Sequence, residues 1–370
     1  MKSVLFISLM NSDVWGGSEE IWYQAALWLA KEKHKIGVCF FGWPGKENRI
    51  EEFKKAGCTV FLLPGKNETR SIIGRFRLKH KLRSVPFHQY DHVVVNQGGW
   101  KDVVHSPFKN LWKKLPSYSL LFHNYNIEEK VSGQKLKCLG DWVNYSKVNM
   151  GAAARIFTET IKAYSVKIPN HRVLYNPITF TPPKETVHYP SISDKINFSM
   201  LAALDTERKA QDVLVKALAN DKWKNRDWEL NLFGHGKDEQ VLKRIIIENG
   251  LESKVFLRGH TTNVKEALTN SHLILQITRI DAMPISVLEA MAMARPIVVS
   301  DVGDMQIWVQ EGVNGWTADA VSTVAIDQVL ETAWNKKERW AEMGKESFRI
   351  FHQKYPADPV QHFLTTAAII

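Results

Sequence analysis

Short runs of apolar residues alternate with amphipathic stretches along the whole chain. In the first half, continuous apolar runs lie at residues 4–9, 36–41, 59–63, 92–95, 119–122, 155–157 and 173–175. Between the first two runs, Ile21, Ala25 and Leu29 recur at the spacing of one helix face. Continuous rather than alternating apolar strands are typical of a parallel sheet covered by helices. The first half is therefore predicted to be an α/β domain.

The alternation of apolar runs and amphipathic stretches stops at a proline-rich segment and then resumes. Pro182, Pro183 and Pro190 disfavour a helix or a central strand, so we expect an interdomain linker at about residues 180–193. Beyond it, strands are predicted at 196–202, 230–233, 255–257, 273–277 and 296–300, and helices at 209–220 and 286–294. The expected fold is two doubly wound α/β domains, residues 1–180 and 194–355, facing each other across a cleft. The terminal helix at 356–370 is expected to pack back on the first domain.

Length and charge suit two domains of different character. The 370 residues are too many for one ordinary core of roughly 100–200 residues. Residues 1–200 hold 29 Lys+Arg against 16 Asp+Glu, whereas residues 201–370 hold 20 against 23. A basic half joined to a near-neutral half suggests that the first half meets something anionic.

Cysteine usage and hydropathy predict a cytoplasmic protein. An odd number of cysteines, Cys39, Cys58 and Cys138, argues against a disulfide framework. No apolar run approaches the roughly 18 residues of a membrane-spanning helix. The apolar N-terminus lacks a small-residue cleavage site, so we interpret it as a buried strand and not as a signal peptide.

Two segments carry candidate chemistry. Gly16-Gly17 follows the first expected strand, where backbone amides can approach a phosphate or a sugar; a plain tight turn explains the same glycines. In the second half, Asp281 follows a strand and Glu289 lies about one turn into a helix that Pro284 can begin. Both carboxylates can then face the cleft, beside helix N–H groups that suit a diphosphate. A capping acid followed by a solvated helix acid is the alternative.

At these residues the chain resembles a known family. The segment from Asp281 to Ala292, continued by Arg295-Pro296 and Gly303, is similar to the family 4 retaining glycosyltransferases of the GT-B fold, whose hallmark is two acids separated by seven residues. Further motifs that match this family are Gly16-Gly17, His123, Asn176-Pro177, Gly234-His235-Gly236, Gly259 and Gly312-Val313-Asn314-Gly315. The resemblance covers nearly the whole chain. It implies two facing Rossmann-like domains, the first for the acceptor and the second for the nucleotide sugar.

The resemblance also assigns roles to individual residues. It implies that Lys209 reaches the diphosphate and that Glu289 binds the ribose. Asp281 and His123 are the implied catalytic residues beside the donor sugar. The other residues expected to bind the nucleotide sugar are Gly16, Gly17, Arg208, Gly234 and Ser286. The chain departs from the family where Ala203 replaces an arginine and Asp281 replaces a glutamate, which implies a divergent member.

The expected reaction needs no metal and no cofactor. The sequence holds no Asp-x-Asp pair and no His/Cys/carboxylate cluster with zinc spacing. The co-substrate expected is a UDP- or GDP-sugar, and the acceptor is a hydroxyl of a glycan or lipid-linked glycan. Retention without a strong nucleophile fits a front-face attack assisted by the leaving diphosphate, and a covalent intermediate on Asp281 is the alternative.

A basic stretch suggests a membrane partner. Residues 66–88 carry seven Lys and Arg, among them Arg70, against one acid, with Ile72, Ile73 and Phe76 interleaved. At helical spacing this gives an apolar face with a basic rim, typical of helices that lie on anionic membranes, and residues 109–115 are similar. Peripheral attachment to the inner face of the membrane is therefore expected, with a core-packed helix as the alternative. Nucleic acid is the least favoured partner for this basic stretch, because the sequence contains no recognised nucleic-acid-binding module.

Two rival functions share these features. Epimerases and phosphorylases also use two α/β domains, but the acid pair of Asp281 and Glu289 disfavours them. A catalytically degenerate GT-B protein that acts as a membrane-associated binding or scaffold subunit is suggested by Ala203 and Asp281.

Overall fold

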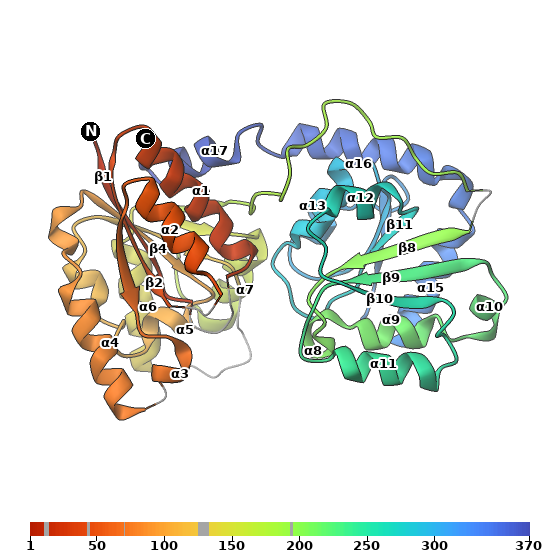
Figure 1. The fold of residues 1–370 in the computed structure, drawn as a ribbon, viewed down its shortest axis with the longest axis horizontal. Coiled ribbons are helices and arrows are strands. Elements are labelled where there is room, and N and C mark those ends of the chain that lie inside the picture. Colours follow the sequence, from red (N-terminus) through yellow and green to blue (C-terminus); the bar gives the residue numbers. More distant parts are fainter. Residues whose placement is uncertain (11–14, 43–44, 70, 125–132, 193–194) are drawn as a thin grey trace. The chain divides into compact units, whose positions relative to one another are not determined.

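The computed structural model describes residues 1–10, 15–42, 45–69, 71–124, 133–192 and 195–370 (Figure 1). The chain divides into two compact units, of which the first comprises Met1–Pro177 with Asp358–Ile370 and the second comprises Ile178–Ala357. Residue 193 of the expected linker, residue 194 of the expected second domain, and Arg70 lie outside the described residues.

The first unit is built on a seven-stranded parallel sheet with the order β3-β2-β1-β4-β5-β6-β7. Its strands are β1 Ser3–Ser8, β2 Lys35–Phe41, β3 Thr59–Leu63, β4 His92–Gln97, β5 Tyr118–Phe122, β6 Asn149–Gly151 and β7 His171–Val173. Its helices are α1 Gly17–Lys31, α2 Glu47–Lys55, α3 Lys66–Thr69, α4 Ile72–Ser84, α5 Lys101–Val104, α6 Gly133–Tyr145, α7 Ala154–Tyr164 and α17 Pro359–Thr366, with 3-10 turns at Phe87–Gln89 and Leu111–Lys114.

The second unit repeats this plan with a six-stranded parallel sheet in the order β10-β9-β8-β11-β12-β13. Its strands are β8 Ile196–Leu201, β9 Trp228–Phe233, β10 Val255–Gly259, β11 Leu273–Gln276, β12 Ile297–Ser300 and β13 Gly315–Ala318. Its helices are α8 Thr206–Lys209, α9 Gln211–Ala217, α10 Asp221–Lys224, α11 Glu239–Glu248, α12 Val264–Thr269, α13 Ile285–Ala292, α14 Met305–Trp308, α15 Thr323–Trp334 and α16 Trp340–Lys354, with a 3-10 turn at Lys337–Arg339. The two doubly wound parallel sheets confirm the expected α/β fold class.

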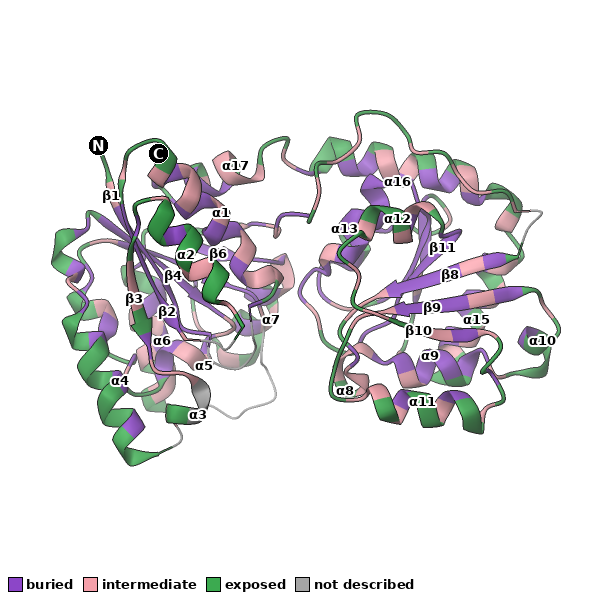
Figure 2. Ribbon diagram, viewed as in Figure 1, coloured by how far each residue is buried: buried purple, intermediate pink, exposed green. Residues whose placement is uncertain are grey.

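Burial explains why continuous apolar runs became strands. Central strands such as β4 are buried along their whole length, and Figure 2 shows the inner strands of both sheets largely in purple. Helices cover these sheets, so side chains on both faces of a strand leave water, and alternation of apolar and polar residues is not required.

One expected strand is a helix. Residues 155–157 lie in α7, where buried Ile156, Phe157 and Thr160 recur at helical spacing. The strand at this place is β6, which has three residues and one large apolar side chain, Met150. β6 and β13 are too short and too mixed in polarity for an apolar run to indicate them. The helix expected at 209–220 is also interrupted, because Ala210 adopts a left-handed conformation with φ of 50° between α8 and α9.

Aromatic side chains form the core of each unit. In the second unit, the ring of Phe198 lies 5.9 Å from that of Trp228 and 6.3 Å from that of Trp340. In the first unit, Phe6 of β1 contacts Phe363 of α17, with 6.4 Å between ring centroids. Ser119 Oγ of β5 also donates a hydrogen bond to the Ala367 carbonyl (2.9 Å). The last helix is therefore part of the core of the first unit.

Two mid-helix glycines give a matched test of packing. A Cβ on Gly344 of α16 would lie 2.1 Å from the Ala294 carbonyl oxygen, whereas a Cβ on Gly140 of α6 meets nothing closer than 3.9 Å. Alanine favours a helix over glycine by about 1 kcal/mol, but overpacking costs about 1–3 kcal/mol. In urea unfolding, Gly344→Ala should lower the midpoint and Gly140→Ala should maintain or raise it. Equal shifts for the two variants would contradict the close packing of α16 on Ala294.

Candidate functional site

Each sheet has a point where the strand order reverses, between β1 and β4 in the first unit and between β8 and β11 in the second. In open α/β sheets, ligands bind outside the carboxyl ends of the strands at such a point. The segments that follow β8 and β11 contain Ala203, Lys209 and Asp281. The ends of β4 and β5 carry Asn96 and His123. Each of these two clusters belongs to one unit.

Glycines allow the loops of the second unit to pack backbone against backbone. A Cβ on Gly234, at φ of 148°, would lie 2.0 Å from the Ala202 carbonyl oxygen, and one on Gly236 would lie 2.1 Å from the Leu204 carbonyl oxygen. The Leu204 amide donates to the His235 carbonyl (3.0 Å) in the same contact. Any side chain at Gly234 or Gly236 would push this loop away from the start of α8.

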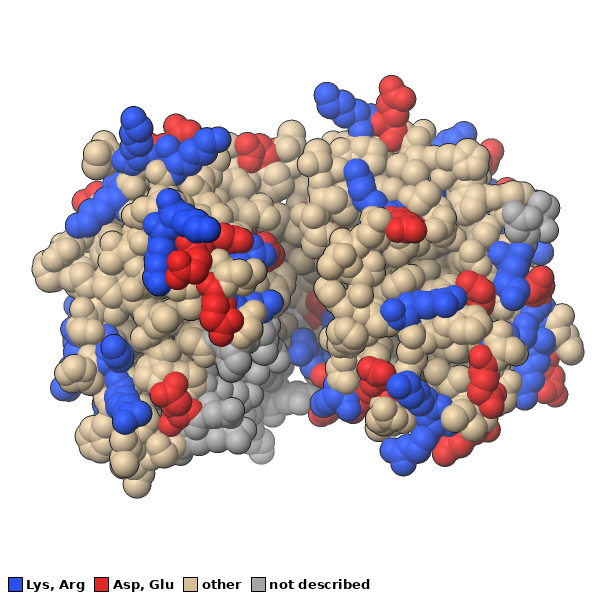
Figure 3. All heavy atoms as spheres, in the orientation of Figure 1, with Lys and Arg blue, Asp and Glu red and all other residues tan. Residues whose placement is uncertain are grey.

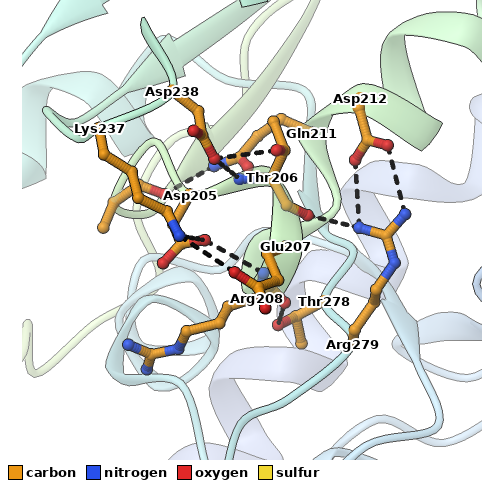
Figure 4. Close-up of polar contacts among 11 residues, drawn as sticks. Asp205, Thr206, Glu207, Arg208, Gln211, Asp212, Lys237, Asp238, Thr278 and Arg279 are labelled. Carbon is orange, nitrogen blue, oxygen red and sulfur yellow. Dashed lines mark hydrogen bonds and ion pairs between the residues drawn. The ribbon is translucent and has the colours of Figure 1, made fainter. Parts of the chain in front are cut away.

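Side chains of neighbouring segments then fix the short helix α8 (Figure 4). The Asp238 carboxylate accepts from both the backbone amide (2.8 Å) and the hydroxyl (2.9 Å) of Thr206. Arg279 pairs with Asp212 (3.1 Å) and also donates to the Thr206 carbonyl. The Arg208 carbonyl accepts from the Thr278 hydroxyl (2.7 Å), so the loop after β11 is tied to α8.

This arrangement brings Lys209 and Asp281 together. The Lys209 ammonium forms an ion pair with Asp281 Oδ2, and the two side chains are only 14% and 17% exposed. Asp281 Oδ1 accepts from the backbone amide of Ala282 (2.9 Å). The two residues are 72 positions apart in sequence, and the fold brings them into contact.

The loop that carries Asp281 rests on Gly303. This glycine has φ of 58°, and a Cβ there would lie 1.8 Å from the Ala282 carbonyl oxygen and 2.7 Å from that of Asp281. The same Ala282 carbonyl accepts from the Asp304 amide (2.9 Å). Gly303 therefore allows the loop that carries Asp281 to pack directly on the backbone that follows β12.

Glu289 of α13 is buried and accepts two hydrogen bonds from Thr179. Its Oε1 accepts from the backbone amide of Thr179 (2.9 Å) and from the Thr179 hydroxyl. Burial raises the pKa of Glu289, and the two Thr179 donors oppose that rise. Ser286, in the first turn of the same helix, donates to Gln276 Oε1 (2.9 Å) inside the unit. The Ser286 hydroxyl is therefore engaged with β11.

In the first unit, His123 is buried after β5. Its Nε2 lies 2.7 Å from Asn96 Oδ1, and its Nδ1 has no hydrogen-bond partner among the described residues. Burial lowers the pKa of the His123 ring to about 3, so the ring is neutral at physiological pH. Gln97, next to Asn96, is also buried, and neither of its side-chain amide atoms has a hydrogen-bond partner in the described part of the chain.

At the glycine pair, an acidic side chain occupies the start of the helix. Gly16 caps α1, and Glu19 Oε2 accepts from the Gly16 amide (3.2 Å) and from the Ser18 hydroxyl (2.5 Å). A carboxylate at this position satisfies helix N–H groups and repels a second anion. Gly17 is the first residue of α1. The binding role expected of Gly16 and Gly17 stays a prediction.

Sequence reasoning did not identify two of these residues. Thr179 contacts Glu289 across 110 positions, which no local pattern indicates. The sequence does contain an indication of Asn96. The apolar residues Val93-Val94-Val95 of β4 are followed by the buried polar pair Asn96-Gln97 at the end of the strand. Buried polar side chains at the carboxyl end of a parallel strand point to a ligand site.

No group of three or more His, Cys, Asp or Glu that could hold a metal occurs within the described ranges. In the second unit, acidic and basic side chains lie interspersed over the face drawn in Figure 3, in keeping with its near-neutral balance. Among the described residues, Lys209 and Asp281 form the least exposed of the ion pairs at the carboxyl end of this sheet.

Comparisons with known proteins find relatives for part of the chain and a similar fold for all of it. Residues 195–334 match the family described as Glycosyl transferases group 1. The chain is 23% identical over 155 residues to the poly(ribitol-phosphate) alpha-N-acetylglucosaminyltransferase of Staphylococcus aureus (strain COL), covering 41% of this chain and 31% of that protein. It is 25% identical over 219 residues to the GtfA subunit of the UDP-N-acetylglucosamine–peptide N-acetylglucosaminyltransferase of Streptococcus gordonii, covering 57% and 42%. The chain thus matches less than half the length of these relatives.

A solved structure extends the likeness to the whole chain. HepE of Anabaena in complex with UDP and glucose has a TM-score of 0.74 with this chain at 17% identity, covering 100% of both chains. The matched family segment contains Lys209, Asp281 and Glu289. The chain therefore has the GT-B fold, and its residues 195–334 are similar to the group 1 glycosyl transferases.

Proposed function

We propose that the protein is a retaining glycosyltransferase that moves a sugar from a nucleoside-diphosphate sugar to a hydroxyl of a glycan or lipid-linked glycan. The observation that carries this proposal is the contact of Lys209 with Asp281 after β8 and β11, inside the group 1 glycosyl transferase domain. The names of the two relatives, each a hexosaminyltransferase, and the UDP bound by HepE support a nucleotide-sugar donor.

The second unit supplies groups for each part of the nucleotide. The buried Glu289 carboxylate suits the two hydroxyl donors of a ribose. The Lys209 ammonium suits a diphosphate as a point charge, and α13, which follows Pro284 as its N-cap, has no side-chain cap on its first N–H groups. Because these groups neutralise the leaving diphosphate, the proposed reaction needs no metal. Arg208, beside Lys209 on α8, is a second cation for the diphosphate and offsets Ala203.

Asp281 and His123 are assigned to the donor sugar. In the proposed front-face reaction, the bond between the anomeric carbon and the phosphate oxygen breaks while the acceptor oxygen bonds to that carbon. The acceptor proton passes to the departing phosphate oxygen. Lys209 stabilises the negative charge that develops there, and Asp281 orients both Lys209 and the sugar.

The rival proposal is a catalytically degenerate GT-B protein that serves as a binding or scaffold subunit. Ala203 in place of an arginine and Asp281 in place of a glutamate suggest it. The intact Lys209–Asp281 pair and the buried Glu289 favour the enzyme, because a protein that binds no donor has no need to keep these charges out of water.

A donor panel tests the enzyme directly. The full chain is incubated with UDP- and GDP-sugars, with and without EDTA, and release of the nucleoside diphosphate is measured. We expect turnover of at least one donor in EDTA, and Lys209→Met should lower kcat/KM by about 10²–10³-fold. Lys243→Met is the matched control, because Lys243 is exposed on α11 and pairs with Glu239 (2.8 Å). If no donor is bound or hydrolysed, the scaffold proposal takes its place.

Thr179 tests the ribose site. Thr179→Val removes one donor to Glu289, so it should raise the pKa of that carboxyl further and weaken UDP binding. A carboxyl whose folded-state pKa is raised costs stability above that pKa, and the cost fades as the pH falls. Thr179→Val should therefore lower the free energy of unfolding by about 1–3 kcal/mol at neutral pH and by less in acid. Thr179→Ser keeps the hydroxyl and should match the wild type in both UDP titration calorimetry and unfolding.

We further propose that α4 lies on an anionic membrane. Ile72, Ile73 and Phe76 are 73%, 67% and 68% exposed, although each is large and apolar. α4 buries only Gly74, Leu78 and Leu82, and it carries five Lys and Arg and no acid. An exposed apolar ridge with cations around it fits a lipid surface better than water. No helix in the described ranges is long and apolar enough to cross a membrane.

The second basic stretch has a different environment. Leu111 and Leu115 are buried, and the ring of Trp112 stacks on that of Tyr145 with 4.6 Å between centroids. For residues 109–115 the core-packed alternative therefore holds, and α4 carries the membrane proposal alone.

Vesicle flotation tests the α4 surface. The full chain should float with phosphatidylcholine vesicles that contain phosphatidylglycerol. With vesicles of phosphatidylcholine alone, it should remain in the unbound fraction. Replacing Ile72, Ile73 and Phe76 by serine should abolish flotation. Val324→Ser, at an equally exposed apolar position (65%) on α15, should leave it unchanged. Equal recovery with neutral and anionic vesicles would refute the electrostatic part of the proposal.

A further inference from the structure

Three histidines of the described residues are buried, and His123 differs from the other two in the hydrogen bonds of its ring. His92 has its ring nitrogens 3.0 Å from Ser117 Oγ and Ser119 Oγ, and His272 has its own at 3.0 Å from the Asn197 amide and the Ser191 carbonyl. His123 has one bonded nitrogen, Nε2, and one buried nitrogen, Nδ1, with no partner among the described residues. A buried polar atom left unpaired costs about 1–3 kcal/mol and calls for an explanation.

We propose that Asn96 is a positioning residue that holds His123 as the neutral Nε2–H tautomer, so that Nδ1 offers a lone pair to a hydroxyl of the donor sugar. The sugar half of this proposal rests on the proposed function. The tautomer half rests on the geometry of the first unit alone.

Contacts of Asn96 determine which way its amide points. Asn96 Nδ2 lies 3.2 Å from Ser8 Oγ and 3.6 Å from Met10 Sδ. A thioether sulfur can accept a hydrogen bond but cannot donate one, so the NH₂ group of Asn96 belongs on that side. Oδ1 then faces His123, and because a carbonyl oxygen only accepts, the proton of the ring lies on Nε2.

The remaining ring nitrogen is then an acceptor. Burial holds the His123 pKa at about 3, so the ring carries one proton and Nδ1 carries none at physiological pH. A bare imidazole nitrogen accepts from O–H or N–H and gains nothing from a phosphate or carboxylate, which bring no proton. The ring follows β5, next to β4 and the reversal point of the sheet, where ligands bind. A sugar hydroxyl is the class of ligand group that fits this position.

The assignment can be measured without enzyme turnover. In long-range ¹H–¹⁵N NMR of the full chain, the ring signals of His123 are identified by their loss in His123→Gln. We expect a protonated Nε2 and an unprotonated Nδ1 throughout pH about 5–8. UDP-glucose, or the donor identified in the panel, should shift the Nδ1 signal, whereas UDP alone should not. A proton on Nδ1, or titration of His123 within this range, would overturn the tautomer assignment whether or not the protein is a transferase.

The variant Asn96→Asp should give a pH-dependent kcat/KM, which would not be expected if Asn96 only stabilised the fold. A carboxylate at this position stabilises the doubly protonated ring and raises the His123 pKa, and a protonated Nδ1 cannot accept a hydroxyl. The kcat/KM of this variant should fall as the pH drops through the raised pKa and recover towards the wild-type value at high pH. Asn96→Leu, which removes the acceptor for Nε2–H, should lose about 10–100-fold at all pH values, and UDP affinity should not change in either variant.

His92→Gln is the matched control, because His92 is buried on β4 and both its nitrogens are bonded. This variant should change the free energy of unfolding, but its kcat/KM should not fall at acidic pH as that of Asn96→Asp does. If folded Asn96→Asp has the wild-type pH profile, or if a donor that is turned over leaves the Nδ1 signal unmoved, His123 does not accept the sugar hydroxyl and that half of the proposal fails.

Discussion

Close approach of backbone to backbone at the carboxyl end of the second sheet is the constraint on which the candidate site depends. Gly234 and Gly236 allow the loop after β9 to touch the loop after β8, and Gly303 allows the loop after β12 to support that of Asp281. These contacts leave no room for a Cβ, so the loops have little freedom to shift. Lys209 and Asp281 meet because the segments that carry them are held by neighbours on both sides.

The polar groups of the two units differ in kind. In the second unit they are charged: an ammonium beside a carboxylate, and a buried carboxylate held by Thr179. At the ends of β4 and β5 in the first unit they are neutral amides and a neutral imidazole, although this unit holds most of the excess positive charge of the chain. The charge lies on the outside, most densely on α4, where it faces water or a partner. A neutral interior surface suits hydroxyl groups, and a charged one suits a diphosphate.

The sequence predicted the two parallel sheets because strands buried on both faces leave continuous apolar runs. It did not predict β6 and β13, which are three and four residues long and carry few large apolar side chains. It indicated Asp281, Glu289 and Lys209 through motif spacing. It did not indicate Thr179 or Asn96, since each acts through a hydrogen bond to a residue that is distant in sequence. It also did not show that the Ser286 hydroxyl is engaged with Gln276, because two buried polar residues look alike in sequence whether they bind a ligand or each other.

The position of α17 has a consequence for how the protein is made. The first unit is discontinuous, because the whole second unit is inserted between Pro177 and Asp358. Phe363, which contacts Phe6 of the first strand, is therefore synthesised after every residue of the second unit. The aromatic surface around Phe6 stays uncovered on the ribosome until the last helix emerges, while the second unit is continuous in sequence and can complete its core earlier. With this connectivity, the core of the first unit is completed only when α17 packs on β1.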